Sequence, residues 1–263
     1  MNKDVSIFDD VMAPAPRYLS RLALVQDMVD LLPAEVDSFL EIGPGMGDLS
    51  DFLAARYPLA HGTMIEFSET GAELLRQRFA GRNHLAVIEQ DIREMPAEKT
   101  FDLIIACEVL EHIENDMEVL ELVAQRLSPN GHFIFSAPAF MSKWHRGDVF
   151  AGHFRRYERN EIATKFPAAG MTIEKLWVFG FPICNILYPL REAYYAMRLR
   201  SANNSKVDAT KLSGVDRALA RKFRWMPMAG ILRPFFLLQS LVKNTSVGDG
   251  FLVLARKSST LDD

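Results

Sequence analysis

The order of apolar and polar positions along the chain predicts strands and helices in alternation. Short apolar runs of strand length recur. A segment with helical character precedes the first of them, at 14–32, and others lie between them, at 48–56 and 161–169. Strands that alternate with helices indicate an α/β protein built on a largely parallel sheet. The seven expected strands are Phe39–Ile42, Gly62–Phe67, Leu85–Ile88, Phe101–Cys107, Gly131–Ser136, Met171–Phe179 and Gly250–Arg256.

The first of these runs leads directly into a glycine-rich turn. Gly43, Gly45 and Gly47 follow Ile42, and a helical segment starts at Asp48. Glycine adopts positive φ angles without steric penalty and lets a ligand approach the backbone closely. Because the first N–H groups of the following helix have no partner within it, they face the same ligand. The pattern therefore predicts a ligand site where the first strand ends.

Polar or acidic residues also end the next three strands. Glu66 lies 19 residues after Gly47, which is about the separation at which a carboxylate binds the hydroxyls of a ribose in such sheets. Asp91 follows the third strand, and Cys107 and Glu108 lie at the end of the fourth. Since ligands bind at the carboxyl edge of a parallel sheet, we expect these side chains to surround one ligand.

Four tracts in this order resemble the class I S-adenosylmethionine (SAM)-dependent methyltransferases. They are Glu41–Gly47 (EIGPGMG), Glu66, Asp91–Ile92 and Cys107–Ile113 (CEVLEHI). The G-P-G-M-G spacing is similar to the turn of this family and differs from the G-x-G-x-x-G of nicotinamide enzymes. The tract EVLEHI resembles the small-molecule branch, which includes enzymes of the ubiquinone and biotin pathways. The resemblance implies a Rossmann-like, seven-stranded sheet whose last strand is antiparallel.

The same resemblance implies which residues hold SAM. The three glycines admit its amino-acid end, and Glu41 orders their turn or meets the amino group through water. Glu66 accepts both ribose hydroxyls, Asp91 accepts the adenine amino group, and Ile92 packs on the adenine ring. An N-terminal helix closes over SAM or simply packs on the sheet. The expected cofactor-binding residues are Glu41, Gly43, Gly45, Gly47, Glu66, Phe67, Asp91, Ile92, Cys107, Glu108, His112, Arg17 and Tyr18.

Methyl transfer from a sulfonium is an in-line displacement, so an enzyme mainly has to align the reactants in a dry site. A base is needed only if the acceptor must lose a proton. The loop after the fifth strand departs from the carboxyl edge and is the best source of such groups. Its candidates are His153 as general base and Tyr157 as an orienting hydroxyl, with Trp144, His145, Arg155 and Arg156 binding the acceptor. The alternative is that these residues anchor the loop through ion pairs with Asp148 or Glu158.

A long segment separates the last two expected strands. Residues 180–249 lie where the family usually has a short turn, so this segment must be a structured insertion. Its eleven Lys and Arg against four Asp and Glu give a net charge of +7, and since the whole chain carries −4, the remainder carries −11. The chain thus divides into an N-terminal helical lid segment (1–36), a SAM-binding core (37–179), a basic and partly apolar insertion (180–249), and the last strand with the tail (250–263).

Two interpretations of the insertion compete with an ordinary solvated face. It either walls a hydrophobic acceptor pocket or rests on an anionic membrane or an acidic carrier protein. No apolar stretch reaches the roughly 18 residues of a membrane span. The opening MNKDVSIFDDVM lacks the apolar stretch of a signal peptide, and the only two cysteines are isolated. We therefore expect a cytoplasmic protein, with peripheral membrane contact as a variant.

The sequence as a whole predicts a SAM-dependent methyltransferase. We expect O-methylation of a hydrophobic or amphipathic small molecule with an anionic group. Methylation of a carrier-bound or membrane-associated lipid intermediate is the first alternative, and a non-catalytic SAM-binding homologue is the second. No Cys-x-x-Cys or His-x-x-x-His spacing suggests a metal, so we expect none. A nucleic-acid partner is not expected, because the total charge is negative and the basic segment lacks interleaved aromatic residues.

Overall fold

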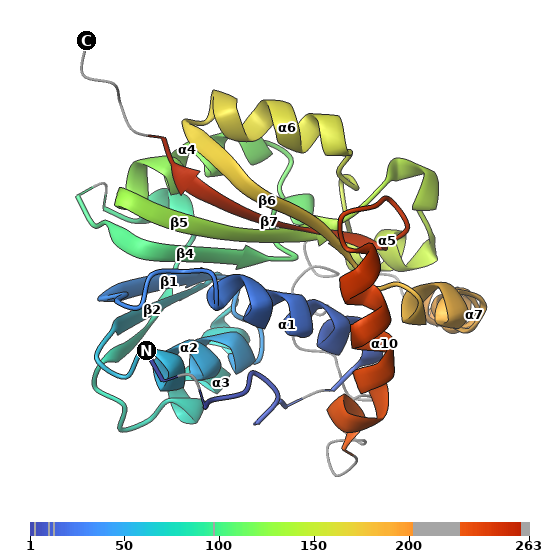
Figure 1. Cartoon of the computed structure of the whole chain (residues 1–263), viewed down its shortest axis with the longest axis horizontal. Helices are drawn as coiled ribbons and strands as arrows, with labels where there is room; N and C mark the ends of the chain where they lie inside the picture. The colour runs from blue at the N-terminus through green and yellow to red at the C-terminus, as the bar shows by residue number, and fades with distance from the viewer. Residues whose placement is uncertain (3, 10, 13, 97, 202–226, 259–263) are drawn as a thin grey trace.

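The computed structural model describes residues 1–258 apart from 3, 10, 13, 97 and 202–226. Its seven strands form one sheet in the order β3-β2-β1-β4-β5-β7-β6, in which β7 runs antiparallel to both neighbours (Figure 1). This confirms the Rossmann-like sheet with an antiparallel last strand. The strands are β1 (Ser38–Ile42), β2 (His61–Glu66), β3 (Leu85–Glu89), β4 (Phe101–Cys107), β5 (Leu127–Pro138), β6 (Met171–Phe179) and β7 (Gly250–Lys257).

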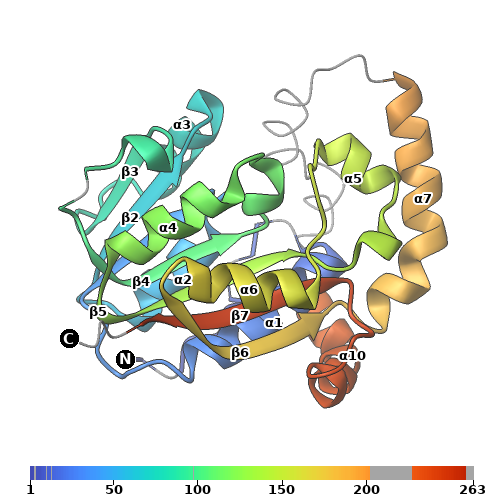
Figure 2. The ribbon, with the colours of Figure 1, turned by 90° about the horizontal axis from the view of Figure 1, so that it is seen from above.

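Helices cover both faces of the sheet (Figure 2). One face carries α1 (Pro16–Val29), α2 (Asp48–Arg56) and α3 (Glu69–Arg78), and the other carries α4 (Asp116–Arg126) and α6 (Arg159–Ala168). The strand β4 shows how the sequence builds these two layers, because successive side chains point to opposite faces. Leu103 and Ile105 join the core under α1 and α2, whereas Ile104 and Ala106 join the core under α4 and α6. A central strand buried on both sides therefore appears as a continuous apolar run.

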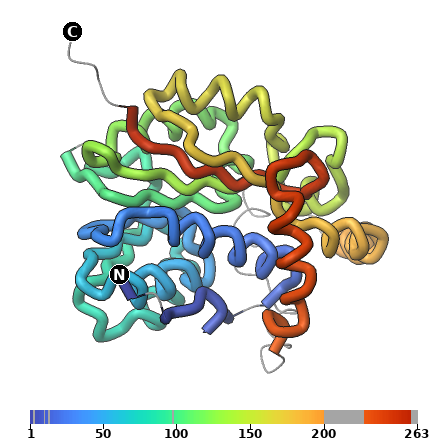
Figure 3. Tube along the Cα trace, in the orientation of Figure 1, coloured from blue at the N-terminus to red at the C-terminus, as the bar shows by residue number. Residues whose placement is uncertain are grey.

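In the described part of the segment between β6 and β7, two helices stand at the carboxyl end of the parallel strands. They are α7 (Ile183–Ser201), which packs against α5 (Arg146–Ala151), and α10 (Met228–Val242), which lies beside α1 (Figure 3). Gln239 fastens α10 in place, since its amide accepts from the Gly180 N–H at 2.6 Å and donates to the Ser20 carbonyl at 2.8 Å. Six basic residues of the predicted insertion lie outside the described residues, namely Lys206, Lys211, Arg217, Arg221, Lys222 and Arg224.

The two helices differ from the rest of the fold in their surfaces. Both expose large apolar side chains, which are Ile186, Leu190 and Met197 on α7 and Ile231, Leu237 and Leu241 on α10. None of the described helices is both long enough and apolar enough to cross a bilayer.

Candidate functional site

Left-handed glycines shape the turn between β1 and α2. Gly43, Gly45 and Gly47 have φ angles of +64°, +57° and +78°. A Cβ added at Gly43 would stand 2.7 Å from Cγ2 of Val109, and one at Gly47 would stand 2.8 Å from the Phe79 ring. The backbone conformation and the available space thus both require glycine at these two positions.

Glu41 supports this turn from below. Its buried carboxylate, one residue before the end of β1, accepts a hydrogen bond from the Ser50 hydroxyl of α2. Burial raises the pKa of Glu41 to about 7, although the Ser50 bond and the charge of Arg21 oppose this shift. The side chain is therefore near its titration point at neutral pH, and a cationic amino group bound above the turn will favour its charged form.

Replacing Glu41 by glutamine should stabilise the protein at high pH. The folded protein holds the Glu41 proton more tightly than the unfolded chain, so the cost of charging this group is absent below about pH 4.5 and complete above about pH 7. We expect Glu41→Gln to raise the free energy of unfolding by roughly 1–3 kcal/mol at pH 8 and by much less at pH 5. Urea denaturation at both pH values checks this, with the exposed Glu35→Gln as control. A difference that grows toward low pH would contradict it.

Glu66 ends β2 beside the glycine turn. The register pairs Ile42 of β1 with Ile65 of β2, and the Gly43 N–H donates to the Ile65 carbonyl over 2.9 Å. The Glu66 carboxylate is buried and accepts from the Ser68 N–H at 3.0 Å. Burial raises the pKa of Glu66. Since a carboxylate can accept about four hydrogen bonds, Glu66 keeps capacity for a ligand.

The residues expected around adenine lie at the next strand end. Asp91 caps the short helix η1 (Ile92–Glu94), and both of its oxygens also bind the Arg93 guanidinium, at 2.8 and 2.6 Å. These hydrogen bonds hold the pKa of Asp91 below its usual value. Ile92 is buried in the core with Ile42, whereas Phe67 is exposed after β2. Binding of adenine by these side chains remains a prediction. Because Arg93 holds both oxygens of Asp91, a ligand that binds Asp91 would also meet Arg93.

The end of β4 is the most highly charged part of the edge. Burial raises the pKa of the Cys107 thiol to about 11, so it is not a nucleophile at neutral pH. Glu108 has a φ of +60°, and its carboxylate pairs with Arg17 and lies 3.7 Å from Arg21. Burial alone would raise the pKa of Glu108, but the two arginines outweigh it and hold the pKa below its usual value. A strained, ionised residue is thus fixed where the sequence predicts the sulfonium side.

The N-terminal helix contributes differently from what the sequence predicts. Arg17 joins Glu108 to Asp249, whose carboxylate its Nε meets at 2.8 Å, and the Tyr18 hydroxyl donates to Asp48 at 3.0 Å. Both polar groups thus have partners within the protein. Contact with the SAM carboxylate remains a prediction for Arg17 and Tyr18, and it requires either side chain to share or exchange its present partner.

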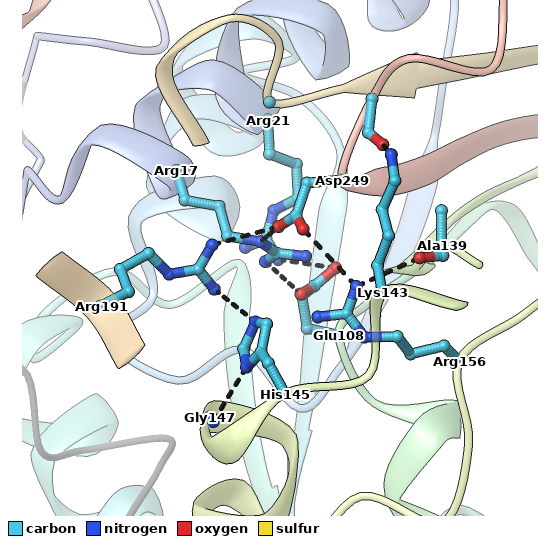
Figure 4. Close-up of polar contacts among 12 residues, drawn as sticks. Arg17, Arg21, Glu108, Ala139, Lys143, His145, Gly147, Arg156, Arg191 and Asp249 are labelled. Atoms are coloured by element: carbon cyan, nitrogen blue, oxygen red, sulfur yellow. Dashed lines mark hydrogen bonds and ion pairs between the residues drawn. The ribbon is translucent and has the colours of Figure 1, made fainter. Parts of the chain in front are cut away.

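Basic side chains from four parts of the chain meet around Asp249, just before β7 (Figure 4). Three guanidinium groups reach its carboxylate: that of Arg17 on α1 at 2.8 Å, that of Arg156 in the loop before α6 at 3.5 Å, and that of Arg191 on α7 at 3.4 Å. These charges hold the pKa of Asp249 far below its usual value despite its burial. We call this group the arginine cluster, and it comprises Arg17, Arg21, Lys143, Arg156 and Arg191 with Glu108, Asp148 and Asp249.

The structure corrects two roles expected for the loop after β5. Arg156 is 2% exposed, and its guanidinium binds Asp148 at 2.9 Å and the Ala139 carbonyl at 3.1 Å. Tyr157 is 1% exposed, and its hydroxyl donates to Asp116 at 2.6 Å within the core under α4 and α6. Both side chains thus hold the loop onto the sheet, and we retain neither as a group that touches the acceptor.

The remaining candidates of this loop have mixed positions. Arg155 is partly exposed and pairs with Asp116 at 2.7 Å. Trp144 is half-buried just after η3 (Met141–Lys143). His145 caps α5, since its Nδ1 accepts from the Gly147 N–H at 2.8 Å, and its Nε2 lies 3.2 Å from Arg191. Burial lowers the pKa of His145 to about 4, so it is neutral at pH 7.

His153 occupies the position that best fits a role in chemistry. Its Nδ1 lies 2.9 Å from Oδ1 of Asp148, and its Nε2 points toward Glu111, 4.0 Å from Oε1. The His112 ring meets it edge-on, with 4.6 Å between the ring centroids. A carboxylate that binds one ring nitrogen fixes the orientation of the imidazole, which suits a base or a ligand at the other nitrogen.

Several charged residues of this site have no role assigned by the sequence. Glu111 lies within the tract EVLEHI, but only the structure shows that it meets His153. The place of Asp249 in the site, in contrast, can be predicted from the sequence. Because β7 is antiparallel, its beginning and not its end lies at the carboxyl edge of the other strands, so an acid just before it belongs to the site.

A family model described as a methyltransferase domain matches residues 40–133, the stretch from β1 into β5 that contains the glycine turn, Glu66 and Glu108. Over this stretch the chain is similar to methyltransferase domains. The chain is 29% identical over 117 residues to the malonyl-[acyl-carrier protein] O-methyltransferase of Haemophilus ducreyi, and 28% identical over 127 residues to that of Priestia megaterium. The matched segments are 42% and 48% of this chain, and the chain spans less than half of either relative, 45% and 46%.

Solved structures match the chain over nearly its whole length. The N-methyltransferase NodS of Bradyrhizobium japonicum, in complex with S-adenosyl-L-homocysteine, has a TM-score of 0.55 and 17% identity over 97% of this chain and 93% of that one. A SAM-dependent methyltransferase of Mesorhizobium loti has a TM-score of 0.55 and 15% identity over 90% and 99%. At such low identity the likeness concerns the fold.

Proposed function

We propose that this chain binds SAM at the carboxyl edge of its sheet and transfers the methyl group to an oxygen of an acceptor that carries an anionic group. The observation that carries the cofactor half is the buried, incompletely satisfied carboxylate of Glu66 beside the left-handed glycines of the β1–α2 turn. A ribose placed against Glu66 brings the amino-acid end of SAM to the glycines and its sulfonium toward Glu108.

Replacing Glu66 by glutamine should weaken cofactor binding strongly. The neutral amide keeps the size of the side chain but loses two charge-assisted hydrogen bonds to the ribose, so we expect the Kd of SAM to rise by roughly 10- to 100-fold. Titration calorimetry with SAM and S-adenosylhomocysteine measures this. Glu89→Gln is the matched control, because Glu89 is the register partner of Glu66 on β3 and pairs with Arg76 at the surface. Equal losses in both variants, or no binding by the wild-type protein, would refute the cofactor half.

The arginine cluster supports an anionic acceptor. Its five cations exceed its three carboxylates, so the cluster carries a net charge of +2 next to the proposed sulfonium side. Buried guanidinium groups in excess over carboxylates are typical of sites that bind carboxylate or phosphate. Arg191 lies on α7 of the insertion and Lys143 on η3 of the loop after β5, and we propose them as the groups that meet this anion.

The reaction itself follows from the charges at the edge. The acceptor oxygen donates a lone pair to the methyl carbon while the carbon–sulfur bond breaks, and the sulfur keeps that electron pair and becomes a neutral thioether. The displacement removes positive charge from the sulfur, so the ionised Glu108 favours SAM over its product. A carboxylate acceptor has no proton to lose. A hydroxyl acceptor must lose one, and we propose that the group around His153 activates it.

An acceptor screen tests the second half of the proposal. Radiolabelled SAM is incubated with the protein and fractionated cell extract, and the labelled product is identified, with the Glu66→Gln variant as blank. Free and carrier-bound acceptors are offered separately, because the exposed apolar residues of α7 and α10 and the relatives that act on malonyl-[acyl-carrier protein] favour a carrier-bound acceptor as the second candidate. SAM binding without labelled product in any fraction would indicate a non-catalytic homologue.

A further inference from the structure

The carboxylate of Glu111 is unusual among the charged groups of this protein. It is 0% exposed, and neither oxygen has a hydrogen-bond partner among the described residues. An unpaired carboxyl group in the interior is costly. Neither Arg17 nor Arg21 forms an ion pair with it, because both lie against Glu108, and Arg155 binds Asp116.

Two histidines lie against this carboxylate. His112 is its neighbour at the end of the short helix η2 (Leu110–His112), and His153 follows α5. Each of Glu111, His112 and His153 offers one ligand atom, and the three atoms lie within 4.8 Å of one another. The residues come from two separate loops at the carboxyl edge, so the tertiary fold and not the local sequence brings them together.

Both imidazoles also have a hydrogen-bond partner outside this group of three. Asp148 binds Nδ1 of His153 at 2.9 Å, and the backbone of Ala151 hydrogen-bonds the His112 ring. Histidines that bind metals commonly have such a carboxylate or backbone partner, which fixes the tautomer and aims the other nitrogen at the metal. Two histidines packed in the core would explain the ring contact. They would not explain why the buried carboxylate of Glu111 has no hydrogen-bond partner among the described residues.

We propose that Glu111, His112 and His153 bind one divalent cation of the first transition row. Two imidazoles and one carboxylate suit Zn²⁺, Mn²⁺, Fe²⁺ or Co²⁺ better than Mg²⁺, which requires mainly oxygen ligands. Bonds of about 2.0–2.2 Å require the three side chains to close by about an ångström. Three protein ligands leave positions open for oxygens of a bound molecule, as in catalytic rather than structural sites.

The role of this cation rests on the proposed methyl transfer. A hydroxyl oxygen of the acceptor that binds the cation becomes more acidic and releases its proton to solvent, and the resulting alkoxide or phenolate attacks the methyl carbon. The sulfur of SAM leaves with the carbon–sulfur electron pair. His153 is then a ligand and not the general base that the sequence suggests, because the cation occupies its Nε2. The site would favour acceptors with two neighbouring oxygens, which can both bind the cation.

The test measures the metal directly on the full chain, after dialysis against EDTA and without SAM. We expect titration calorimetry with Zn²⁺, and electron paramagnetic resonance with Mn²⁺, to show one ion per chain and a higher melting temperature with Zn²⁺. Glu111→Gln should weaken Zn²⁺ binding by at least about 100-fold. The matched control, Glu114→Gln, changes the charge equally at an exposed position three residues away and should bind as the wild type does.

Misfolding is not expected to confuse this result. Glu111→Gln removes a buried ionisable group, so without metal it should melt no lower than the wild type. Equal Zn²⁺ affinity in the Glu111 and Glu114 variants, or no binding by the wild-type chain, would overturn the site. Failure of the proposed function is distinguishable, because SAM binding is measured separately on the EDTA-treated protein. Metal binding without SAM binding would leave this site standing and remove only its role in methyl transfer.

Discussion

Replacing His153 by alanine is expected to lower the kcat of methyl transfer to a hydroxyl acceptor by about 10²- to 10⁴-fold, the range found for groups that activate a nucleophile. The Nε2 atom of His153 faces Glu111 beyond the end of β4, and its Nδ1 is held by Asp148. The residues expected to hold the amino-acid end, the ribose and the adenine of SAM lie at the ends of β1, β2 and β3. The Kd of SAM should therefore change by less than about threefold. Single-turnover kinetics and calorimetry on the same variant separate the two quantities.

His61→Ala is the matched control for this prediction. His61 is exposed at the beginning of β2, at the opposite edge of the sheet, so its removal should leave both kcat and SAM affinity unchanged. Full activity of the His153 variant toward a hydroxyl acceptor would remove this residue from the chemistry altogether. Normal activity toward a carboxylate acceptor, combined with loss toward a hydroxyl acceptor, would assign it to activation of the nucleophile.

Replacing Asp249 by asparagine is expected to destabilise the fold by about 3 kcal/mol, because the removal of one partner leaves buried charges uncompensated. Arg17, Arg156 and Arg191 all lie within 3.5 Å of this carboxylate. Their charges depress the pKa of Asp249, so its stabilising contribution is present at every pH above the ordinary pKa of an aspartate. It is lost only as strong acid protonates the folded protein. The free energy of unfolding that Asp249→Asn loses should consequently be the same at pH 6 and pH 8.

Asp27→Asn provides the comparison. Asp27 is 47% exposed and lies 3.7 Å from Lys243, a pair that water screens, so we expect a change of less than about 0.5 kcal/mol. Urea denaturation of both variants at pH 6 and pH 8 gives the two differences. If Asp249→Asn lowers the free energy of unfolding no more than Asp27→Asn does, the charge of Asp249 does not stabilise the arginine cluster.

The sheet and its cofactor edge could be predicted because their signals are local. A strand buried on both faces must be apolar throughout, and the turn after β1 must contain glycine because its φ angles are positive and neighbouring side chains leave no room for a Cβ. The place of Glu66 follows from the same argument, since the register of β1 and β2 carries any residue after Ile65 to the rim of that turn.

The loop after β5 could not be predicted in the same way. Arg155, Arg156 and Tyr157 are adjacent in sequence, yet one pairs near the surface, one crosses to Asp148 and Asp249, and one enters the core under α4. Polar side chains in a loop look alike in sequence whether they meet a ligand or another part of the chain. The partner decides the role, and here the partners are Asp116, Asp148 and Asp249.

Glu111 illustrates the opposite difficulty. Its tract is among those that show the resemblance to the methyltransferases, but the feature that matters is the lack of a partner around a buried carboxylate. Whether a side chain is satisfied depends on every segment packed around it, and no window of sequence contains that information. The expectation that no metal is bound rested on short ligand spacings, which do not reveal ligands from two separate loops.

Asp148 divides its two oxygens between different tasks. Oδ1 binds His153, while Oδ2 accepts from the His145 N–H at 2.8 Å and from Arg156 at 2.9 Å. Anyone who wishes to redirect this protein toward a new acceptor should therefore spare the stretch from His145 to Arg156, because a library randomised there would mix altered selectivity with failed expression. Met141 belongs to the same frame, since its sulfur accepts from the Arg156 N–H at 3.3 Å, so Trp144 is the position at which variation can be sampled with the scaffold intact.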